Sequence, residues 1–180
     1  ISLCNYESYI ADGNIQRETR RNRILTELIS IIDKEEKVKF LFFIINGNKR
    51  VGDKSITYES IKKCNIRNEY AIIEYKRDIR SLWMQVARCD FFLSTRLHAG
   101  LFAAFANVPF MLIEYHQKCS DFLNDIGYNK QYRIYDLDLS IDEIKHNIMK
   151  IVNERSSYKW PLYIDQMREK AYSNFYGVNI

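Results

Sequence analysis

Arg96 and His98 are the residues of this chain whose types and spacing best fit a chemical role. They follow the hydroxyl pair Ser94 and Thr95 and precede a segment of small residues. An arginine beside free backbone N–H groups at the start of a helix would bind an anion. A histidine there can also exchange a proton near neutral pH. The alternative is structural, with Arg96 paired to a carboxylate and His98 satisfied in the core.

The segments on either side predict how these residues are positioned. Residues 90–93 form an apolar run too short for a helix and typical of a buried parallel strand. Ser94 and Thr95 are suitable N-cap residues for the small-residue helix that follows. A second strand is expected at 110–113, after Asn107 and Pro109. We therefore expect residues 94–98, the strand–helix corner, at the carboxyl end of a strand and in the first turn of a helix.

The rest of the chain alternates between strand and helix patterns. Further strands are predicted at 1–6, 38–45, 70–75 and 132–135, and helices at 17–34, 78–88, 141–152 and 160–175, with shorter ones beginning near 55 and 120. This alternation predicts a single α/β domain, residues 1–180, built on an open, mostly parallel Rossmann-like sheet with helices on both faces. Ligands of such sheets bind outside the carboxyl ends of the strands.

Several polar residues receive local roles from the same patterns. Ser55, Asp78, Ser120 and Ser140 are expected to cap helices, and a helix should stop at Gly127. The arginines at 17, 20, 21 and 23 are expected on a solvated helix face. His116 and His146 are expected at the surface. Glu114 is expected either to neutralise Arg96 or to act as a base toward an acceptor hydroxyl.

The residues around the strand–helix corner resemble the signature of the polysaccharide pyruvyl transferase family. The resemblance rests on Ser-x-Arg-Leu-His, a small-residue helix, Val-Pro-Phe, a strand ending in tyrosine, and a following lysine and Asp-Phe-Leu. The matching residues are Ser94, Arg96, Leu97, His98, Ala103, Pro109, Tyr115, Lys118, Phe122 and Gly127. The resemblance implies the C-terminal, donor-binding half of a longer two-domain, GT-B-like enzyme. A missing N-terminal half would supply the other wall of the cleft and most of the acceptor site, and this chain alone would be inactive without it.

The reaction implied by the resemblance moves a pyruvyl group from phosphoenolpyruvate to two hydroxyls of a polysaccharide sugar, forming a ketal. Arg96 and the helix start would bind the donor, and Ser94, Thr95, Tyr115 and Lys118 would be further substrate-binding residues. His98, expected to be buried beside Arg96, would be the general acid or would protonate the leaving phosphate. Phosphoenolpyruvate is the donor substrate, and no metal or other cofactor is expected.

The resemblance also implies a setting and shows one departure. The acceptor would be a sugar or a lipid-linked oligosaccharide of a surface polysaccharide or exopolysaccharide. The protein would work in the cytoplasm, with peripheral contact at the inner face of the membrane as a further expectation. Relatives often have a basic residue near the end of the first strand of this half, where this chain has Cys4-Asn5-Tyr6. The second anion contact would then come from elsewhere.

Two alternative functions stay open at this stage. A GT-B-type glycosyltransferase domain would place a nucleotide-sugar diphosphate on the same helix start, but it would also need a late carboxylate for the ribose hydroxyls, and the sequence shows no clear motif for one. A catalytically silent relative would keep the fold as an interaction domain. Intact Arg96 and His98 favour the enzyme over the silent relative.

Composition excludes several other classes. The chain has 180 residues, of which 47% are apolar, so it can form one domain with a full core and is not disordered. The net charge of +4 is too modest, and lacks the aromatic interleaving, for a nucleic-acid module. The four cysteines have no CxxC spacing, which indicates free thiols rather than a metal site. No apolar run is long enough to span a membrane.

Overall fold

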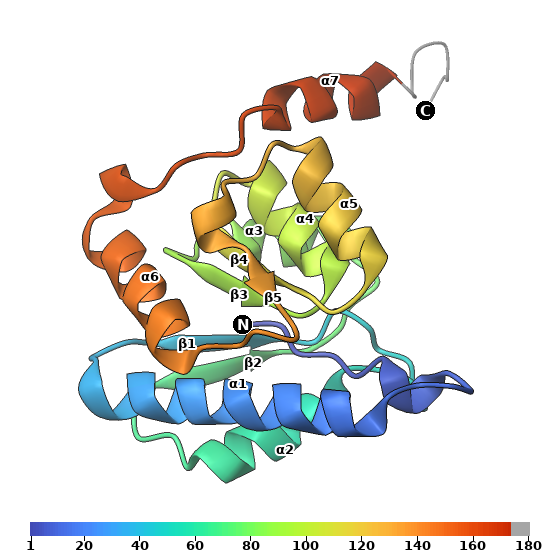
Figure 1. The fold of residues 1–180 in the computed structure, drawn as a ribbon, viewed down its shortest axis with the longest axis vertical. Coiled ribbons are helices and arrows are strands. Elements are labelled where there is room, and N and C mark those ends of the chain that lie inside the picture. The colour runs from blue at the N-terminus through green and yellow to red at the C-terminus, as the bar shows by residue number, and fades with distance from the viewer. Residues whose placement is uncertain (174–180) are drawn as a thin grey trace.

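The computed structural model describes residues 1–173 and shows a mixed α/β architecture (Figure 1). The strands are β1 (Phe40–Phe43), β2 (Tyr70–Ile73), β3 (Phe92–Ser94), β4 (Phe110–Glu114) and β5 (Ile134–Tyr135). The α-helices are α1 (Ile15–Glu35), α2 (Lys54–Cys64), α3 (Ile79–Val86), α4 (Leu97–Phe105), α5 (Gln117–Asp125), α6 (Ile141–Asn153) and α7 (Ile164–Ser173). Three short 3-10 turns are η1 (Glu7–Tyr9), η2 (Lys130–Tyr132) and η3 (Arg155–Ser157).

The start of the chain joins two sets of parallel strands. β1 pairs with β2, and β4 lies between β3 and β5. Ile1 donates its backbone nitrogen to the Leu41 carbonyl at 2.7 Å, and Ser2 donates to the Leu93 carbonyl at 2.9 Å. The order is therefore β2, β1, residues 1–3, β3, β4, β5. With the first segment counted as strand 1, this is the 3-2-1-4-5-6 order of the Rossmann fold, and the predicted fold class is confirmed.

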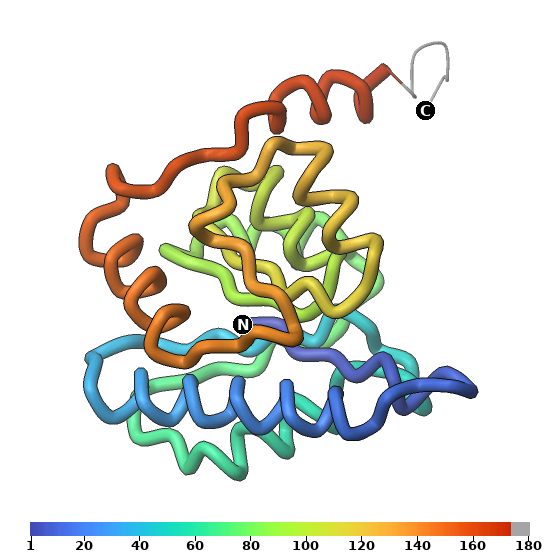
Figure 2. Tube along the Cα trace, in the orientation of Figure 1, coloured from blue at the N-terminus to red at the C-terminus, as the bar shows by residue number. Residues whose placement is uncertain are grey.

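Helices cover both faces of the sheet. In Figure 1, α1 and α2 lie on one face, while α3, α4 and α5 lie on the other. Phe42, Phe43, Phe92 and Phe110 are fully buried between these layers. The trace in Figure 2 shows α7 standing off the end of the molecule, where it contacts α4. Because the strands are covered on both faces, their sequences are almost continuously apolar.

The predicted helix boundaries are partly confirmed. The side chains of Asn14, Asp78 and Ser140 accept hydrogen bonds from backbone amides in the first turns of α1, α3 and α6, as capping requires. Gly127 follows α5 with a φ of 62°, so a residue with a Cβ would be strained there. The sequence can predict such caps because a capping side chain bonds only to backbone amides in the first turn of its own helix.

Other boundaries differ from the prediction. α2 begins after Asp53 rather than at a Ser55 cap, and α5 begins at Gln117 with His116, not Ser120, as its cap. The last helix begins at Ile164, a few residues after the expected start, and Phe175 lies outside the described residues. The strands β1, β2, β3 and β5 are shorter than predicted, whereas β4 extends one residue further, to Glu114.

All four cysteines are free thiols, as the sequence predicted. Cys4, Cys64 and Cys119 are buried, and Cys89 is half-buried. Their wide spacing in the sequence is matched by their separate places in the core. Among the helices of residues 1–173, none has the length and apolar character needed to cross a membrane.

Candidate functional site

The strand–helix corner lies at the switch point of the sheet, where the strand order reverses. β3 ends there beside the first segment, and the two are fastened together by side chains. The Thr95 hydroxyl accepts from the Cys4 amide at 2.7 Å. The Ser94 hydroxyl accepts from the Arg96 amide at 2.9 Å and donates to the Arg96 carbonyl at 2.8 Å. Both hydroxyls are buried, so they shape the corner.

The expected capping of α4 by Ser94 and Thr95 is therefore wrong. The N-cap position is held by Arg96, whose side chain makes no capping bond. Within residues 1–173, the amides of Leu97 and His98 donate to no acceptor outside the helix. Unpaired amides at a helix start point outward with partial positive charge. The corner thus offers two open N–H donors beside the Arg96 side chain.

Arg96 is held by a buried carboxylate that sequence reasoning missed. Its guanidinium forms an ion pair with Asp53, which lies 43 residues earlier and is fully buried. The other carboxylate oxygen of Asp53 accepts from the amides of Ile45 at 3.2 Å and Asn46 at 2.8 Å. Asp53 is therefore fixed on three sides. One signal could have identified it, namely its position just after the predicted strand 38–45 and before the next helix.

The Arg96 guanidinium keeps donors for a further anion. Its side chain is 19% exposed, and its Nε is buried with no hydrogen-bond partner among the described residues. Burial alone would lower the pKa of Arg96, but the acidic groups Cys4 and Asp53 raise it on balance. Burial raises the pKa of Asp53, although Arg96 and the two amides oppose that shift. The structural interpretation of Arg96 is therefore confirmed by its ion pair with Asp53, and the guanidinium keeps an N–H group that this ion pair does not use.

Tyr115 reaches the corner from the end of β4. Its hydroxyl lies 3.9 Å from the Cys4 sulfur, and the Arg21 guanidinium carbon lies 5.0 Å from the centre of its ring. Burial raises the pKa of Tyr115 above its usual range, so the phenol stays protonated. Residues from four parts of the sheet edge, Cys4, Asp53, Arg96 and Tyr115, therefore meet at this point.

His98 and Lys118 lie in the first turns of α4 and α5, and both are exposed. The expected burial of His98 is wrong, because the small residues of α4 that pack on the sheet are Ala99, Gly100 and Ala103 on the opposite side of the helix. The Lys118 ammonium forms no ion pair with any residue of the range 1–173. Neither side chain is engaged in a hydrogen bond or ion pair with another of residues 1–173.

Arg21 is buried rather than solvated, contrary to the sequence prediction. It is fully inaccessible and donates to Glu7 at 3.0 and 2.6 Å and to Asp136 at 2.9 Å. Three carboxylates surround it, since Glu18 lies 3.8 Å away. The Arg21 guanidinium lies over the Tyr115 ring, and Tyr115 contacts Cys4 in the segment where relatives often have a basic residue. The charge of Arg21 is, however, already neutralised by its carboxylate partners. Arg21 positions Tyr115 and does not replace the second anion contact.

Two further residues also differ from their predicted roles. Glu114 forms an ion pair with Arg133, whose Nε lies 2.7 Å from the carboxylate, so it neither neutralises Arg96 nor stands free as a base. His116 is half-buried and its Nδ1 accepts from the Lys118 amide at 3.1 Å. That bond makes His116 the N-cap of α5. His146 is exposed, as predicted.

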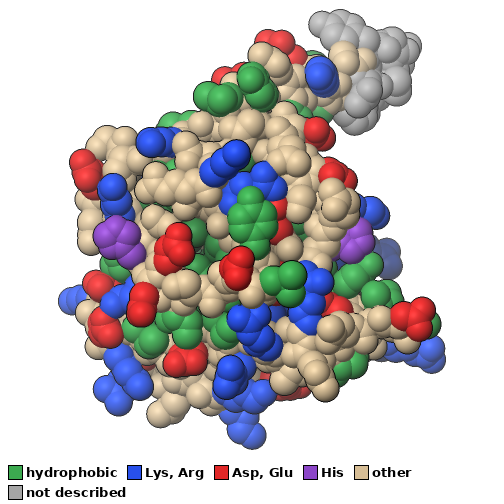
Figure 3. All heavy atoms as spheres, viewed as in Figure 1, with side chains coloured by type: hydrophobic (Ala, Val, Ile, Leu, Met, Phe, Trp, Pro, Cys, Tyr) green, Lys and Arg blue, Asp and Glu red, His purple; other side chains and the backbone are tan. Residues whose placement is uncertain are grey.

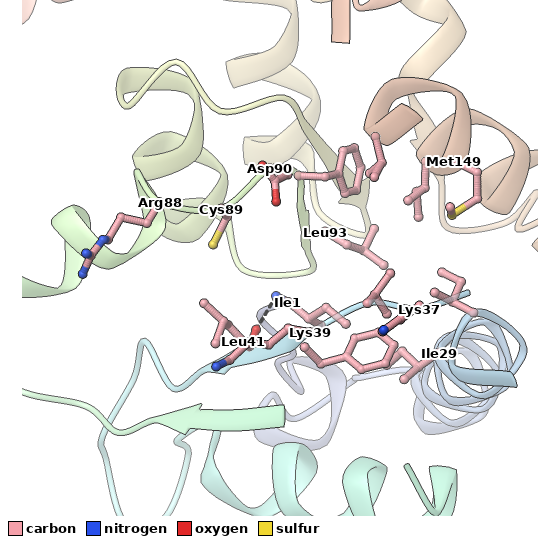
Figure 4. Close-up of a pocket in the computed structure, with 16 residues that line it drawn as sticks. Ile1, Ile29, Lys37, Lys39, Leu41, Arg88, Cys89, Asp90, Leu93 and Met149 are labelled. Atoms are coloured by element: carbon pink, nitrogen blue, oxygen red, sulfur yellow. Dashed lines mark hydrogen bonds between the residues drawn. The ribbon is translucent and has the colours of Figure 1, made fainter. Parts of the chain in front are cut away.

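A cavity of about 380 Å³ lies elsewhere, at the amino ends of β1 and β3. Figure 4 shows Ile1, Leu41, Cys89 and Leu93 around it, with Met149 contributed by α6. Its lining is mostly apolar and includes no residue of the strand–helix corner. In an open parallel sheet the carboxyl ends of the strands bind ligands, so the corner is the better candidate site.

A family model described as polysaccharide pyruvyl transferase matches residues 6–117. The chain belongs to the polysaccharide pyruvyl transferase family. The matched span includes Asp53, Arg96, His98 and Tyr115 and ends immediately before Lys118. Comparison with curated proteins and with solved structures gave no match. Membership in this family indicates a transferase of polysaccharide biosynthesis.

The described part of the chain, residues 1–173, contains no group of three or more metal-ligating side chains close enough to hold an ion. The polar groups that converge at the corner are the Arg96 guanidinium with its Asp53 partner, backbone amides and the Tyr115 phenol, and the guanidinium and amides suit an anionic ligand. The arrangement can therefore bind a small molecule with several negative charges and place a histidine beside it.

Proposed function

We propose that the strand–helix corner binds phosphoenolpyruvate and transfers its pyruvyl group to two hydroxyls of a polysaccharide sugar, forming a ketal. The observation that carries this proposal is Arg96, fixed by buried Asp53 at the open start of α4 with an unpartnered Nε. Phosphoenolpyruvate presents a carboxylate and a phosphate in a small volume. A planar guanidinium and outward-pointing amides match two such groups.

Each residue at the corner has a separate part in this proposal. Arg96 and the amides of Leu97 and His98 bind the donor anion. Lys118 adds a point charge from the start of α5. Ser94 and Thr95 hold the bend, since their hydroxyls are already bonded within the protein. Tyr115 stays protonated, and because its hydroxyl oxygen accepts from the Cys4 thiol, its own proton can be donated to an oxygen of the donor.

The proposed reaction has two bond-forming steps. The methylene carbon of phosphoenolpyruvate accepts a proton, and the first sugar hydroxyl oxygen bonds to the adjacent carbon C2. The second hydroxyl then bonds to C2 as the bond from C2 to the phosphate oxygen breaks, and inorganic phosphate leaves. The protons lost by the two hydroxyls balance the one added to carbon and the one taken up by phosphate or solvent. His98 is the general acid in this scheme, because it is the histidine in the first turn of α4.

Calorimetric titration with phosphoenolpyruvate tests the donor site. The wild-type chain should bind, Arg96→Ala should lose binding, and Arg23→Ala, an exposed arginine on α1, should bind normally. Because Arg96→Ala leaves Asp53 buried without its partner, Arg96→Ala with Asp53→Asn serves as a second variant whose folding is better preserved. Circular dichroism of each variant checks that the fold is intact.

Two results would contradict the proposal. Binding of phosphoenolpyruvate that survives in both Arg96 variants would place the donor elsewhere. Binding of a nucleoside diphosphate through Arg96, without binding of phosphoenolpyruvate, would favour a glycosyltransferase donor site instead. A chain that binds neither ligand would fit a silent relative.

A further inference from the structure

Three aromatic rings pack against one another beside the strand–helix corner. The centre of the Tyr6 ring lies 5.4 Å from that of Tyr115 and 4.9 Å from that of His116. Tyr6 follows the first segment and the other two follow or end β4, so they come from the two segments that pair with β3 on either side. On the face shown in Figure 3, apolar side chains are instead scattered among interspersed acidic and basic ones. All three rings are half-buried, so part of each one meets solvent.

Tyr9 extends this group of rings. It lies in η1, which contacts α1 at the N-terminal end of that helix (Figure 1), and it is 37% exposed. Burial raises the pKa of Tyr9, and the charges of Asp53 and Arg96 also act on it. The Tyr9 phenol is therefore close to the ion pair of the strand–helix corner. We define the aromatic patch as Tyr6, Tyr9, Tyr115 and His116.

The loop that carries the first two members of the aromatic patch, residues 6–13, is held in one shape. The buried carboxylate of Glu18 accepts from the Tyr6 amide at 2.5 Å. A Cβ at Gly13 would lie 1.7 Å from the Glu7 carbonyl oxygen, so only glycine fits where the loop closes. A surface that is ordered before its ligand arrives loses less entropy on binding. The aromatic patch is thus formed in advance of any ligand.

The aromatic patch combines apolar rings with polar ends. Each tyrosine ends in a hydroxyl, which can both donate and accept. His116 uses Nδ1 to accept from the Lys118 amide, and its Nε2 has no partner among residues 1–173. A sugar has the same two characters, with C–H groups on the faces of its ring and hydroxyls around its rim. Sites for such ligands are lined by aromatic rings with a few polar groups, so the patch suits an uncharged sugar.

The other neighbour of the corner has a different character. The loop between β1 and α2 presents the exposed cations Lys49 and Arg50 before it reaches Asp53. Cations suit an anion better than an uncharged sugar. A ketal forms only if two hydroxyls of one sugar lie beside the donor carbon, so that sugar must rest on a surface adjoining the corner. Of these two surfaces, the aromatic patch is the one that matches a sugar ring.

We propose that the aromatic patch binds the sugar ring that receives the pyruvyl group. The inference rests on the proposed function and deepens it, because it assigns a sugar subsite to residues of this chain. The rings contact the C–H face of a hexose, and the tyrosine hydroxyls and Nε2 of His116 form hydrogen bonds with its hydroxyls. Tyr6 and Tyr9 are then residues that determine acceptor specificity, separate from the donor contacts at Arg96.

Saturation-transfer NMR with the methyl β-glycosides of glucose, galactose and mannose tests the proposal. At least one glycoside should receive saturation from the protein, mainly on the C–H protons of one ring face. Tyr6→Leu with Tyr9→Leu removes two rings but keeps apolar side chains, and it should lower affinity at least about fivefold, the usual effect of losing an aromatic contact. Tyr172→Leu on α7, where the tyrosine is 77% exposed, is the matched control and should bind normally.

Circular dichroism checks the fold of each variant. If the double variant does not fold, Tyr9→Leu alone replaces it, because Tyr9 is the more exposed of the two positions.

Calorimetry with phosphoenolpyruvate on the same proteins separates the sugar subsite from the donor site. The tyrosine variants should keep phosphoenolpyruvate affinity while they lose the glycoside. A wild-type chain that binds phosphoenolpyruvate but no glycoside would overturn the sugar subsite and leave the donor site standing. So would glycoside binding that is unchanged in the tyrosine variants, or that falls equally in Tyr172→Leu. Glycoside binding through the patch without phosphoenolpyruvate binding would support the subsite and contradict the proposed donor.

Discussion

Asp53 determines how Arg96 is presented to a ligand. Its carboxylate is fully buried, and two backbone amides keep it in place regardless of any ligand. A surface arginine would lose side-chain entropy on binding an anion, but Arg96 is already ordered by Asp53. The sequence offered two interpretations of Arg96, a structural ion pair and an anion receptor. The structure shows the ion pair with Asp53, and the anion-receptor role stays a prediction that the ion pair leaves room for, because a guanidinium has more donors than a single carboxylate can use.

We expect Asp53→Ala to destabilise the fold by about 3 kcal/mol, because it leaves Arg96 half-buried without a partner and frees two buried amides. Arg96→Met combined with Asp53→Ala should lose clearly less than the sum of the two single losses. Urea unfolding of the four proteins measures this coupling. Additive losses would show that the ion pair contributes no coupling energy.

We expect His98→Asn to keep phosphoenolpyruvate affinity and to lower turnover by about 10²–10⁴-fold, the usual contribution of a positioned acid. His98 is exposed and makes no hydrogen bond from its side chain within residues 1–173, so the substitution should leave the fold unchanged. His146→Asn, at an exposed position on α6, is the matched control. Normal turnover in His98→Asn would rule out its proposed role.

The loop between β1 and α2 is the element that places Asp53. Asn48 accepts from the amides of Arg50 at 2.8 Å and Val51 at 3.1 Å, which folds the loop on itself. A Cβ at Gly52 would lie 2.1 Å from the Asn48 carbonyl oxygen, which is backbone and cannot move aside. Glycine is therefore required where the chain turns into Asp53 and α2. The sequence pattern gave no clear element here, because the loop is organised by its own side chains rather than by apolar periodicity.

We expect Gly52→Ala to destabilise the protein by about 1–3 kcal/mol and to weaken phosphoenolpyruvate binding through displacement of Asp53. Gly100→Ala on α4 is the matched control, because its Cβ would meet only the flexible Leu112 side chain at 3.3 Å and gains helix propensity. Thermal unfolding and calorimetry of both variants measure the two effects. Similar behaviour of the two variants would show that the loop does not depend on Gly52.

Across the whole molecule, buried carboxylates join segments that are far apart in sequence. Asp33 accepts from the amides of Arg67 and Asn68, both at 2.9 Å, which ties α1 to the start of β2. Burial would raise the pKa of Asp33, but these hydrogen bonds lower it below its ordinary value of 3.8. Burial would likewise raise the pKa of Glu7, but Arg21 lowers it below 4.5. Each group therefore adds stability above its unfolded pKa, which is lost as pH falls through its lower folded pKa.

We expect acid to destabilise the protein below about pH 4, as these carboxylates take up protons on unfolding. Asp33→Asn should cost about 1–2 kcal/mol at neutral pH, since an amide oxygen can replace only part of the two bonds. That cost should shrink at a pH well below 3.8, as the wild-type Asp33 carboxylate takes up a proton in the folded state as well. Urea unfolding at both pH values measures the difference, and a cost that does not change with pH would contradict the linkage.

The sequence by itself determined the order of strands and helices, the caps of α3 and α6 and the place of the strand–helix corner. Apolar periodicity and caps depend on neighbours within a few residues, so they can be read along the chain. The resemblance to the family, carried by residues around Arg96, is confirmed by the family match. The second domain that the resemblance implies stays a prediction.

Only the tertiary structure decided which distant groups meet. Asp53 forms an ion pair with Arg96, which lies 43 residues later in the chain. Arg21 can be buried only because Glu7 and Asp136, from other segments, neutralise its charge. His98 is exposed although its helix is apolar, because only one side of α4 packs on the sheet. A sequence pattern shows which residues share a helix side, but the cost of burying a charge depends on partners brought together by the fold.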